Sequence, residues 1–146
     1  MRRILIFLAL VLVALPAWAQ GRQDNWRRCA DKNPDLSIDG CTAVIQSTGQ
    51  ETDEGFAVAY FKRGDAYYNK GLYDQSIADE TQAIALKPDL TDAYGHRGLA
   101  YEKKGLPDMA IPDYRTALKL AAGHPTRDVF VADIAKKGLQ RLGATP

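Results

Sequence analysis

The sequence predicts an all-α protein built from tandem antiparallel helix hairpins, and three observations carry this prediction. Residues 57–90 align without a gap on residues 91–124, and fourteen of the 34 positions are identical. Apolar residues in each copy recur at intervals of three, four and seven, the period of an amphipathic helix. Gly71 and Pro88 interrupt the first copy where helices would end. One hairpin cannot bury its apolar face alone, so we expect neighbouring copies to stack.

Composition excludes several classes of function. Of the 146 residues, 46% are hydrophobic and 25% are charged, as in ordinary soluble proteins. Lys and Arg number 19 against 18 Asp and Glu, whereas nucleic-acid binding by counterion release needs a large basic excess. Two Cys and two His are too few for most metal sites. We therefore predict no nucleic-acid partner, no metal and no cofactor.

The N-terminal segment 1–19 is predicted to be a signal peptide. Arg2 and Arg3 precede an apolar run over 4–15, and Ala17-Trp18-Ala19 has the small-x-small pattern of a cleavage site. The run is shorter than the about 20 residues that a membrane-spanning helix needs. We expect cleavage after Ala19, a periplasmic or secreted mature chain, and no membrane span after cleavage. An uncleaved N-terminal anchor is the alternative.

Export affects the interpretation of the two cysteines. An oxidising compartment favours disulfides, and Cys29 and Cys41 permit a single intramolecular pairing. A bridge closing this loop stabilises a fold by about 3 kcal/mol on the chain-entropy model. The alternative is a reactive pair, although the spacing resembles no redox or haem-attachment motif. A structural disulfide is the preferred interpretation.

Each repeat unit is predicted to contain two helices. In the first unit, residues 53–90, one helix covers 53–69 and ends at Gly71, and a second amphipathic run ends at Pro88. The second unit covers residues 91–124. Gly64 and Gly98 lie where the two helices of each hairpin must approach closely.

These units resemble the tetratricopeptide repeat. The residues that carry the resemblance are Tyr60, Arg63, Gly64, Tyr67, Gly71, Ile77, Ala83 and Pro88 in the first copy, and Tyr94, Arg97, Gly98, Tyr101, Gly105, Ala110, Tyr114 and Ala117 in the second. The resemblance implies a helical solenoid. Glu80 departs from the family pattern, which usually has an aromatic residue there, and Ala122 replaces the terminal proline of the second copy.

The segments on both sides of the repeats read as degenerate units. Residues 20–52 are expected to form an N-terminal hairpin with a short first helix over 24–31. Aligned on the first repeat, Cys29 and Cys41 occupy facing positions, so a disulfide would pin this hairpin. Residues 125–146 are expected to form a capping helix from an N-cap at Thr126. Its predicted apolar side comprises Val129, Ala132, Ala135, Leu139 and Leu142.

No motif for catalysis stands out, and the chain is predicted not to be an enzyme, with no catalytic residues. Arg63 and Asp79 recur 16 residues apart as Arg97 and Asp113. Such pairs could form a charged site, but their duplication favours contacts that tie the helices of each hairpin. His96 has no Ser, Cys or second His at a suggestive spacing and is expected to be exposed.

The resemblance implies a binding function on the concave side of the array, which the first helix of each repeat lines. The candidate partner-binding groove comprises Phe61, Asp65, Tyr68, Asn69, Gly95, Leu99, Glu102 and Lys103. These aromatic and acidic residues suit a protein or peptide with apolar and basic character. The expected function is a periplasmic scaffold or adaptor. A structural, self-associating envelope protein, and thus a homo-oligomer, is the alternative, and an enzyme comes third.

Overall fold

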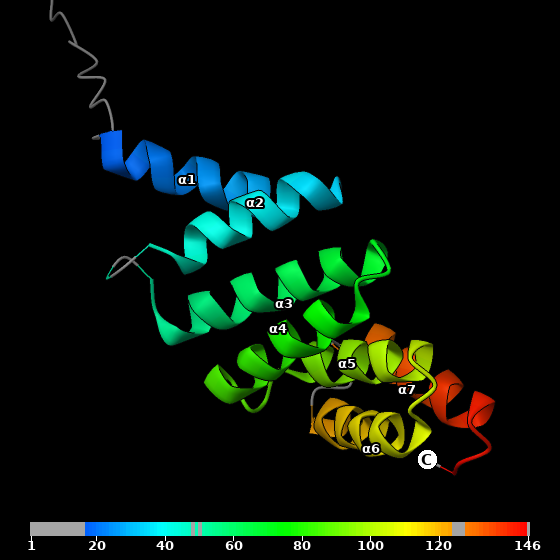
Figure 1. The fold of residues 1–146 in the computed structure, drawn as a ribbon. Helices are drawn as coiled ribbons and strands as arrows, with labels where there is room; N and C mark the ends of the chain where they lie inside the picture. Colours follow the sequence, from blue (N-terminus) through cyan, green and yellow to red (C-terminus); the bar gives the residue numbers. More distant parts are fainter. Residues whose placement is uncertain (1–16, 48, 50, 124–127, 146) are drawn as a thin grey trace, which may run out of the picture.

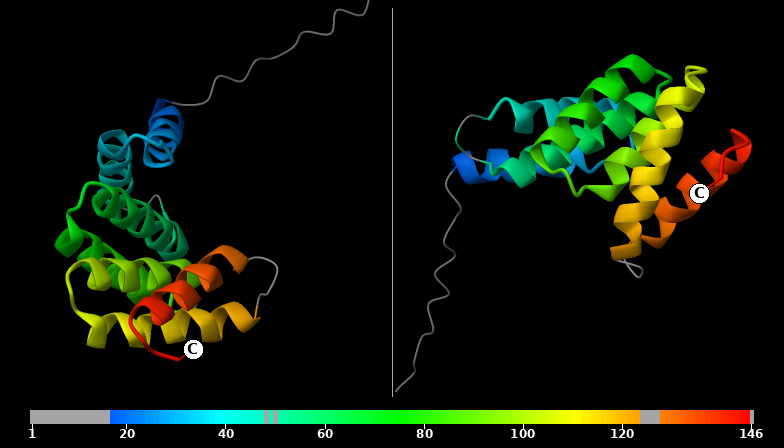
Figure 2. Two further views of the ribbon diagram at one scale, coloured as in Figure 1. Left: turned by 90° about the vertical axis from the view of Figure 1, so that its right-hand side faces the viewer. Right: turned by 90° about the horizontal axis from the view of Figure 1, so that it is seen from below.

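The computed structural model describes residues 17–47, 49, 51–123 and 128–145, and these form seven α-helices and no strand. The helices are α1 (Ala17–Cys29), α2 (Pro34–Ile45), α3 (Asp53–Asn69), α4 (Tyr73–Leu86), α5 (Thr91–Lys103), α6 (Pro107–Gly123) and α7 (Val129–Arg141). Successive pairs pack as hairpins that follow one another from α1–α2 to α5–α6 (Figure 1). Helix α7 lies against α5 and α6 at the far end of the stack (Figure 2).

Local sequence signals set the ends of the helices. The Asn33 side chain accepts the backbone N–H of Asp35 at 2.9 Å, which caps α2, and Thr52 caps α3 by accepting the N–H of Gly55 at 3.1 Å. Gly71 ends α3 with a φ of +75°, as predicted. There the N–H of Leu72 donates to the carbonyl of Tyr67, the bond that closes a helix on a left-handed glycine.

In both full repeats, a glycine of the first helix lets the second helix approach closely. A β-carbon at Gly64 would lie 2.7 Å from Glu80 Oε1, and one at Gly98 would lie 2.7 Å from Tyr114 Cε1. The predicted Arg–Asp contacts are confirmed: Arg63 donates two hydrogen bonds to Asp79, and Arg97 donates two to Asp113, at 2.7–2.9 Å. These pairs tie the hairpins and form no separate site.

The arginines also join neighbouring hairpins. Arg63 Nη1 donates to Thr42 Oγ1 of the preceding hairpin at 3.0 Å, and Arg97 Nη1 donates to Thr81 Oγ1 at 3.1 Å. Lysines repeat the pattern at the hairpin turns, where Lys70 pairs with Asp35 and Lys104 pairs with Asp74. The N-terminal hairpin is therefore attached to the array by the same contacts that join the two full repeats.

The apolar core falls into two clusters with a polar segment between them. The C-terminal cluster contains Ala110, Tyr114, Ala117, Val131, Ala135 and Leu139, and the N-terminal one contains Cys29, Cys41, Val44 and Ala59. Between them Glu80 of α4 is 0% exposed, and neither carboxyl oxygen has a hydrogen-bond partner in the described part of the chain. Burial, with Asp65, Asp79 and Asp92 nearby, raises the pKa of Glu80 well above its ordinary value, against the attraction of Arg97.

Two helix predictions need correction. Helix α1 covers Ala17–Cys29 rather than 24–31, because Asp31 accepts the N–H of Asn33 and so belongs to the turn before α2. In α7, Val129 is 61% exposed, and the buried side is set by Val131, Ala135, Gly138 and Leu139. Helix α7 begins at Val129, and the predicted cap Thr126 lies outside the described residues. Segment 1–16 of the predicted signal peptide also lies outside them.

Among the residues that the structure describes, no helix combines the length and apolar character needed to cross a bilayer.

Candidate binding groove

A cavity of about 310 Å³ lies between the α1–α2 turn and α3. Residues 30–32 and the adjoining ends of α1 and α2 form one wall, and one side of α3 forms the other. The lining comprises Cys29, Ala30, Asp31, Lys32, Pro34, Ser37, Phe61, Lys62, Asp65, Ala66 and Asn69. Its volume is at the lower end of the range for small-ligand pockets, sufficient for a few side chains of a peptide.

Three predicted groove residues of the first repeat, Phe61, Asp65 and Asn69, line this cavity. They follow one another at intervals of four along α3, which places them on one face of the helix. Asn69 Nδ2 donates to Asp65 Oδ2 at 3.4 Å. The structure thus brings these three side chains together.

His96 joins the same group from α5, and the prediction that it is exposed is wrong. Its side chain is only 16% exposed, and its ring lies 5.1 Å from that of Phe61 in an edge-to-face arrangement. Nδ1 lies 3.2 Å from Asp65 Oδ1, within ion-pair distance but without hydrogen-bond geometry. The seam between α3 and α5 covers the ring, which a helix considered alone cannot show.

Tyr68 lies one helical turn beyond Asp65, next to Tyr73 of α4. The two ring centroids are 5.5 Å apart. Burial raises the pKa of Tyr68, as do the nearby Tyr73 and Glu102, so the phenol stays neutral at physiological pH. Tyr68 therefore offers a half-buried ring beside the cavity without lining it.

Three of the four groove residues predicted in the second repeat take part in packing or hydrogen bonds around α7. Gly95 is buried, and a β-carbon there would lie 2.4 Å from Val131 Cγ2, so Gly95 is covered and not open to a partner. Leu99 packs against the C-terminal core cluster. Glu102 accepts two hydrogen bonds from Arg141, at 2.7 and 2.9 Å, and one from Tyr114 at 2.6 Å. Lys103 is exposed.

These bonds explain the electrostatics of the α5–α7 contact. The Arg141 guanidinium lowers the pKa of Glu102, so this carboxylate is charged and satisfied within the chain. Burial and the bond to Glu102 raise the pKa of Tyr114. The open part of the predicted groove is therefore its N-terminal half.

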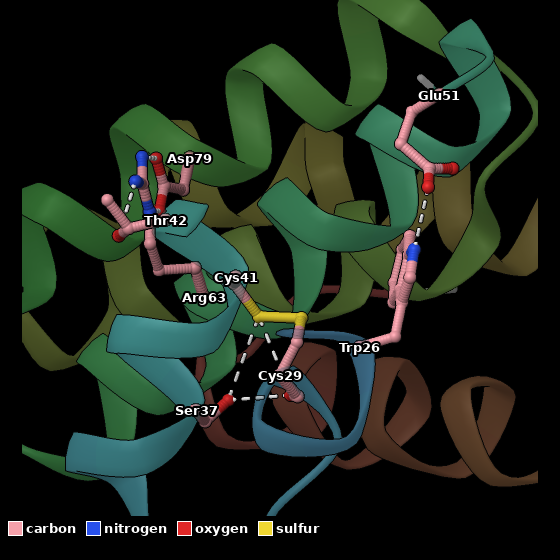
Figure 3. Close-up of a disulfide and its surroundings, with 8 residues drawn as sticks. All are labelled: Trp26, Cys29, Ser37, Cys41, Thr42, Glu51, Arg63 and Asp79. Carbon is pink, nitrogen blue, oxygen red and sulfur yellow. Dashed lines mark hydrogen bonds and ion pairs between the residues drawn. A yellow bond between two sulfur atoms is a disulfide. The ribbon is translucent and has the colours of Figure 1, made fainter. Parts of the chain in front are cut away.

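The predicted disulfide between Cys29 and Cys41 is present and joins α1 to α2 (Figure 3). The Cα atoms are 4.4 Å apart, and Gly40 permits this approach because a β-carbon there would lie 2.3 Å from Cys29 N. Ser37 Oγ donates to the Cys29 carbonyl at 2.9 Å. Cys29 and Ser37 both line the cavity, so the disulfide fixes its wall.

Lys62 and the lining residues of the α1–α2 turn were not among the predicted groove residues. The sequence contains part of the information needed to find them, because a disulfide-pinned hairpin stacked on α3 must place its turn near one end of that helix. The spacing of the turn from Phe61 and Asp65 depends on how the hairpins pack, which one sequence does not give. Among the described residues, no three His, Cys, Asp or Glu side chains gather as a metal site would require.

Stacked hairpins with a groove along one side define a helical-repeat scaffold. Two sequence profiles agree with this class: one described as TPR repeat matches residues 64–105, and one described as tetratricopeptide repeat matches residues 91–124. Residues 64–124 of the chain thus carry tetratricopeptide repeats. No curated protein matches it in sequence. Repeats of this family generally mediate protein–protein interaction and are typically non-enzymatic scaffolds, which supports a protein-binding scaffold.

Proposed function

We propose that the chain is an exported adaptor that binds a segment of another protein in the cavity between the α1–α2 turn and α3. One observation carries the proposal: Phe61, Asp65 and Asn69, predicted as groove residues, line a cavity together with a turn held by a disulfide. A rigid wall lowers the ordering cost of binding. The second half of the predicted groove contributes little, since α7 uses it.

Site-specific photo-crosslinking tests the use of this cavity. A photoreactive residue at the exposed position 69 should crosslink a discrete partner in cells, because Asn69 lines the cavity. The matched control is position 119, exposed on α6, which among the described helices contacts only α5 and α7. Equal products from both positions, or products from 119 alone, would place the interface elsewhere.

The location in the periplasm is part of the proposal. It rests on Arg2, Arg3, the apolar run 4–15 and the Ala17-Trp18-Ala19 pattern, and a disulfide suits an oxidising compartment. Cell fractionation and N-terminal sequencing of the purified protein test it. The expected first residue is Gln20 in the periplasmic fraction, and an intact N-terminus in the membrane fraction would favour the anchor.

Self-association is a second candidate, and one observation favours it. Val129 and Phe130 are 61% and 72% exposed at the start of α7, and Val129 also lines a cavity of about 540 Å³ between α6 and α7. Exposed apolar patches often mark interfaces. Sedimentation would then show a mass that rises with concentration, and Phe130→Ser would abolish the rise. A constant monomer mass would remove this candidate.

A further inference from the structure

The charges around the cavity identify the chemistry of a segment that it can bind. This inference rests on the proposed use of the cavity and adds the class of partner. Two lysines line it from separate elements, Lys32 from the α1–α2 turn and Lys62 from α3. Within the described part of the chain, neither forms an ion pair or a side-chain hydrogen bond.

Several other cations of the array have a carboxylate partner, unlike these two lysines. Lys70 and Lys104, which occupy equivalent positions in the two full repeats, pair with Asp35 and Asp74, respectively. Several arginines also have a carboxylate partner: Arg22, Arg27, Arg28, Arg63, Arg97 and Arg141. Lys32 and Lys62 therefore leave positive charge beside the cavity that the fold does not use.

The carboxylates of the cavity each accept a hydrogen bond from a neutral donor within the chain. Asp31 Oδ1 accepts the backbone N–H of Asn33 at 2.8 Å. Asp65 accepts from Asn69 and lies next to His96, as described above. Glu102, the other acid on which a basic partner was expected to depend, is held by Arg141. Asp31 and Asp65 are therefore each used in part within the chain, whereas Lys32 and Lys62 have no ion pair or side-chain hydrogen bond among the described residues.

We propose that the cavity binds an Asp or Glu side chain of the partner segment between Lys32 and Lys62. Phe61, Pro34 and Ala66 supply an apolar part of the same lining, which suits an apolar residue next to that carboxylate. The ligand is thus an acidic and apolar peptide segment. The Lys contacts supply attraction and orientation, and the apolar contacts supply burial.

An array of C-terminally amidated peptides of random sequence is the probe, with the full exported chain in its oxidised form. Amidation removes the terminal carboxylate, so binding reports side chains alone. Bound peptides should be enriched in Asp and Glu next to apolar residues. Lys32→Gln/Lys62→Gln should weaken the best binder about three- to tenfold, the effect of losing two partly exposed ion pairs. Added salt should weaken wild-type binding.

The matched control is Lys119→Gln/Lys136→Gln, which removes the same charge from exposed positions on α6 and α7. This variant should bind like the wild type. Binding that is equal in both double variants, or bound peptides enriched in Lys and Arg, would overturn the inference. If peptides enriched in Lys and Arg bind and Phe61→Ala abolishes their binding, the proposed function stands without the acidic ligand. A wild-type chain that binds no peptide and gives no crosslink from position 69 would overturn both.

Discussion

Glu80 and Tyr114 occupy the same position in the two repeats but have different surroundings. Tyr114 crosses the hairpin and donates its hydroxyl to Glu102, whereas the shorter Glu80 ends against Gly64 without a partner. Residue 68, the counterpart of Glu102, is a tyrosine, so the two side-chain types are exchanged between the repeats. Only the second arrangement forms a hydrogen bond, which leaves the first repeat with a buried, unsatisfied carboxyl group.

Replacing this carboxyl by an apolar group of similar length should stabilise the protein. Glu80→Met is expected to raise the free energy of unfolding at neutral pH by about 1–3 kcal/mol, the usual cost of a buried unsatisfied polar group. Urea unfolding measures the change. The control, Asp89→Asn, alters an exposed carboxylate and should have little effect. Destabilisation by Glu80→Met would mean that the carboxyl has a partner.

The same carboxyl predicts a pH dependence. Its pKa in the folded chain lies above that in the unfolded chain, so its contribution is most favourable below pH about 4.5 and is lost as pH rises through the folded-state pKa. The free energy of unfolding of the wild type should therefore fall relative to that of Glu80→Met as the pH rises from about 4.5 to the folded-state pKa. Unfolding curves over a pH series measure the difference, and a constant gap would contradict the raised pKa.

At the scale of the helical element, each hairpin depends on a glycine at its crossing. Gly98→Ala should destabilise the fold by about 1–3 kcal/mol, because its β-carbon would lie 2.7 Å from the ring of buried Tyr114. Thermal unfolding measures the loss. Gly21→Ala in α1 is the matched control, since no atom lies within 4 Å of its β-carbon. The control should leave stability unchanged or raise it slightly.

The first hairpin depends on its disulfide instead of a large apolar core. Cys29→Ser/Cys41→Ser should lower the free energy of unfolding by about 3 kcal/mol, the value for a loop of this length. Because Cys29 and Ser37 line the cavity, the variant should also bind acidic peptides more weakly at temperatures where it remains folded. Unchanged binding by the folded variant would show that the turn keeps its position without the bridge.

At the scale of the whole molecule, the buried carboxyl group of Glu80 in α4 lies between the two apolar clusters. In stacked repeats stability is approximately a sum over units and their interfaces, so a weak unit opens locally. Amide hydrogen exchange around Glu80 in α4 should be faster than around Tyr114 in α6, although both residues are buried. Glu80→Met should reduce this difference. Slower exchange in α4 than in α6 would contradict a polar weak point.

Local sequence features were sufficient to predict most of the helices, the repeat and the disulfide. Internal duplication, helical periodicity and Gly71 are local features, and a solenoid packs each unit only on its neighbours, so local pattern and fold agree. The Arg63–Asp79 contact could also be predicted from sequence, because its recurrence in the second repeat indicates a structural role.

Which groove residues stay available depends on how distant helices pack. Gly95, Leu99 and Glu102 read as groove residues by repeat position, yet α7 packs over or bonds to each of them. Lys32 enters the cavity because a disulfide holds the α1–α2 turn beside α3. The physical reason is that periodicity gives the face of a helix, whereas the groups that occupy that face come from segments distant in the chain.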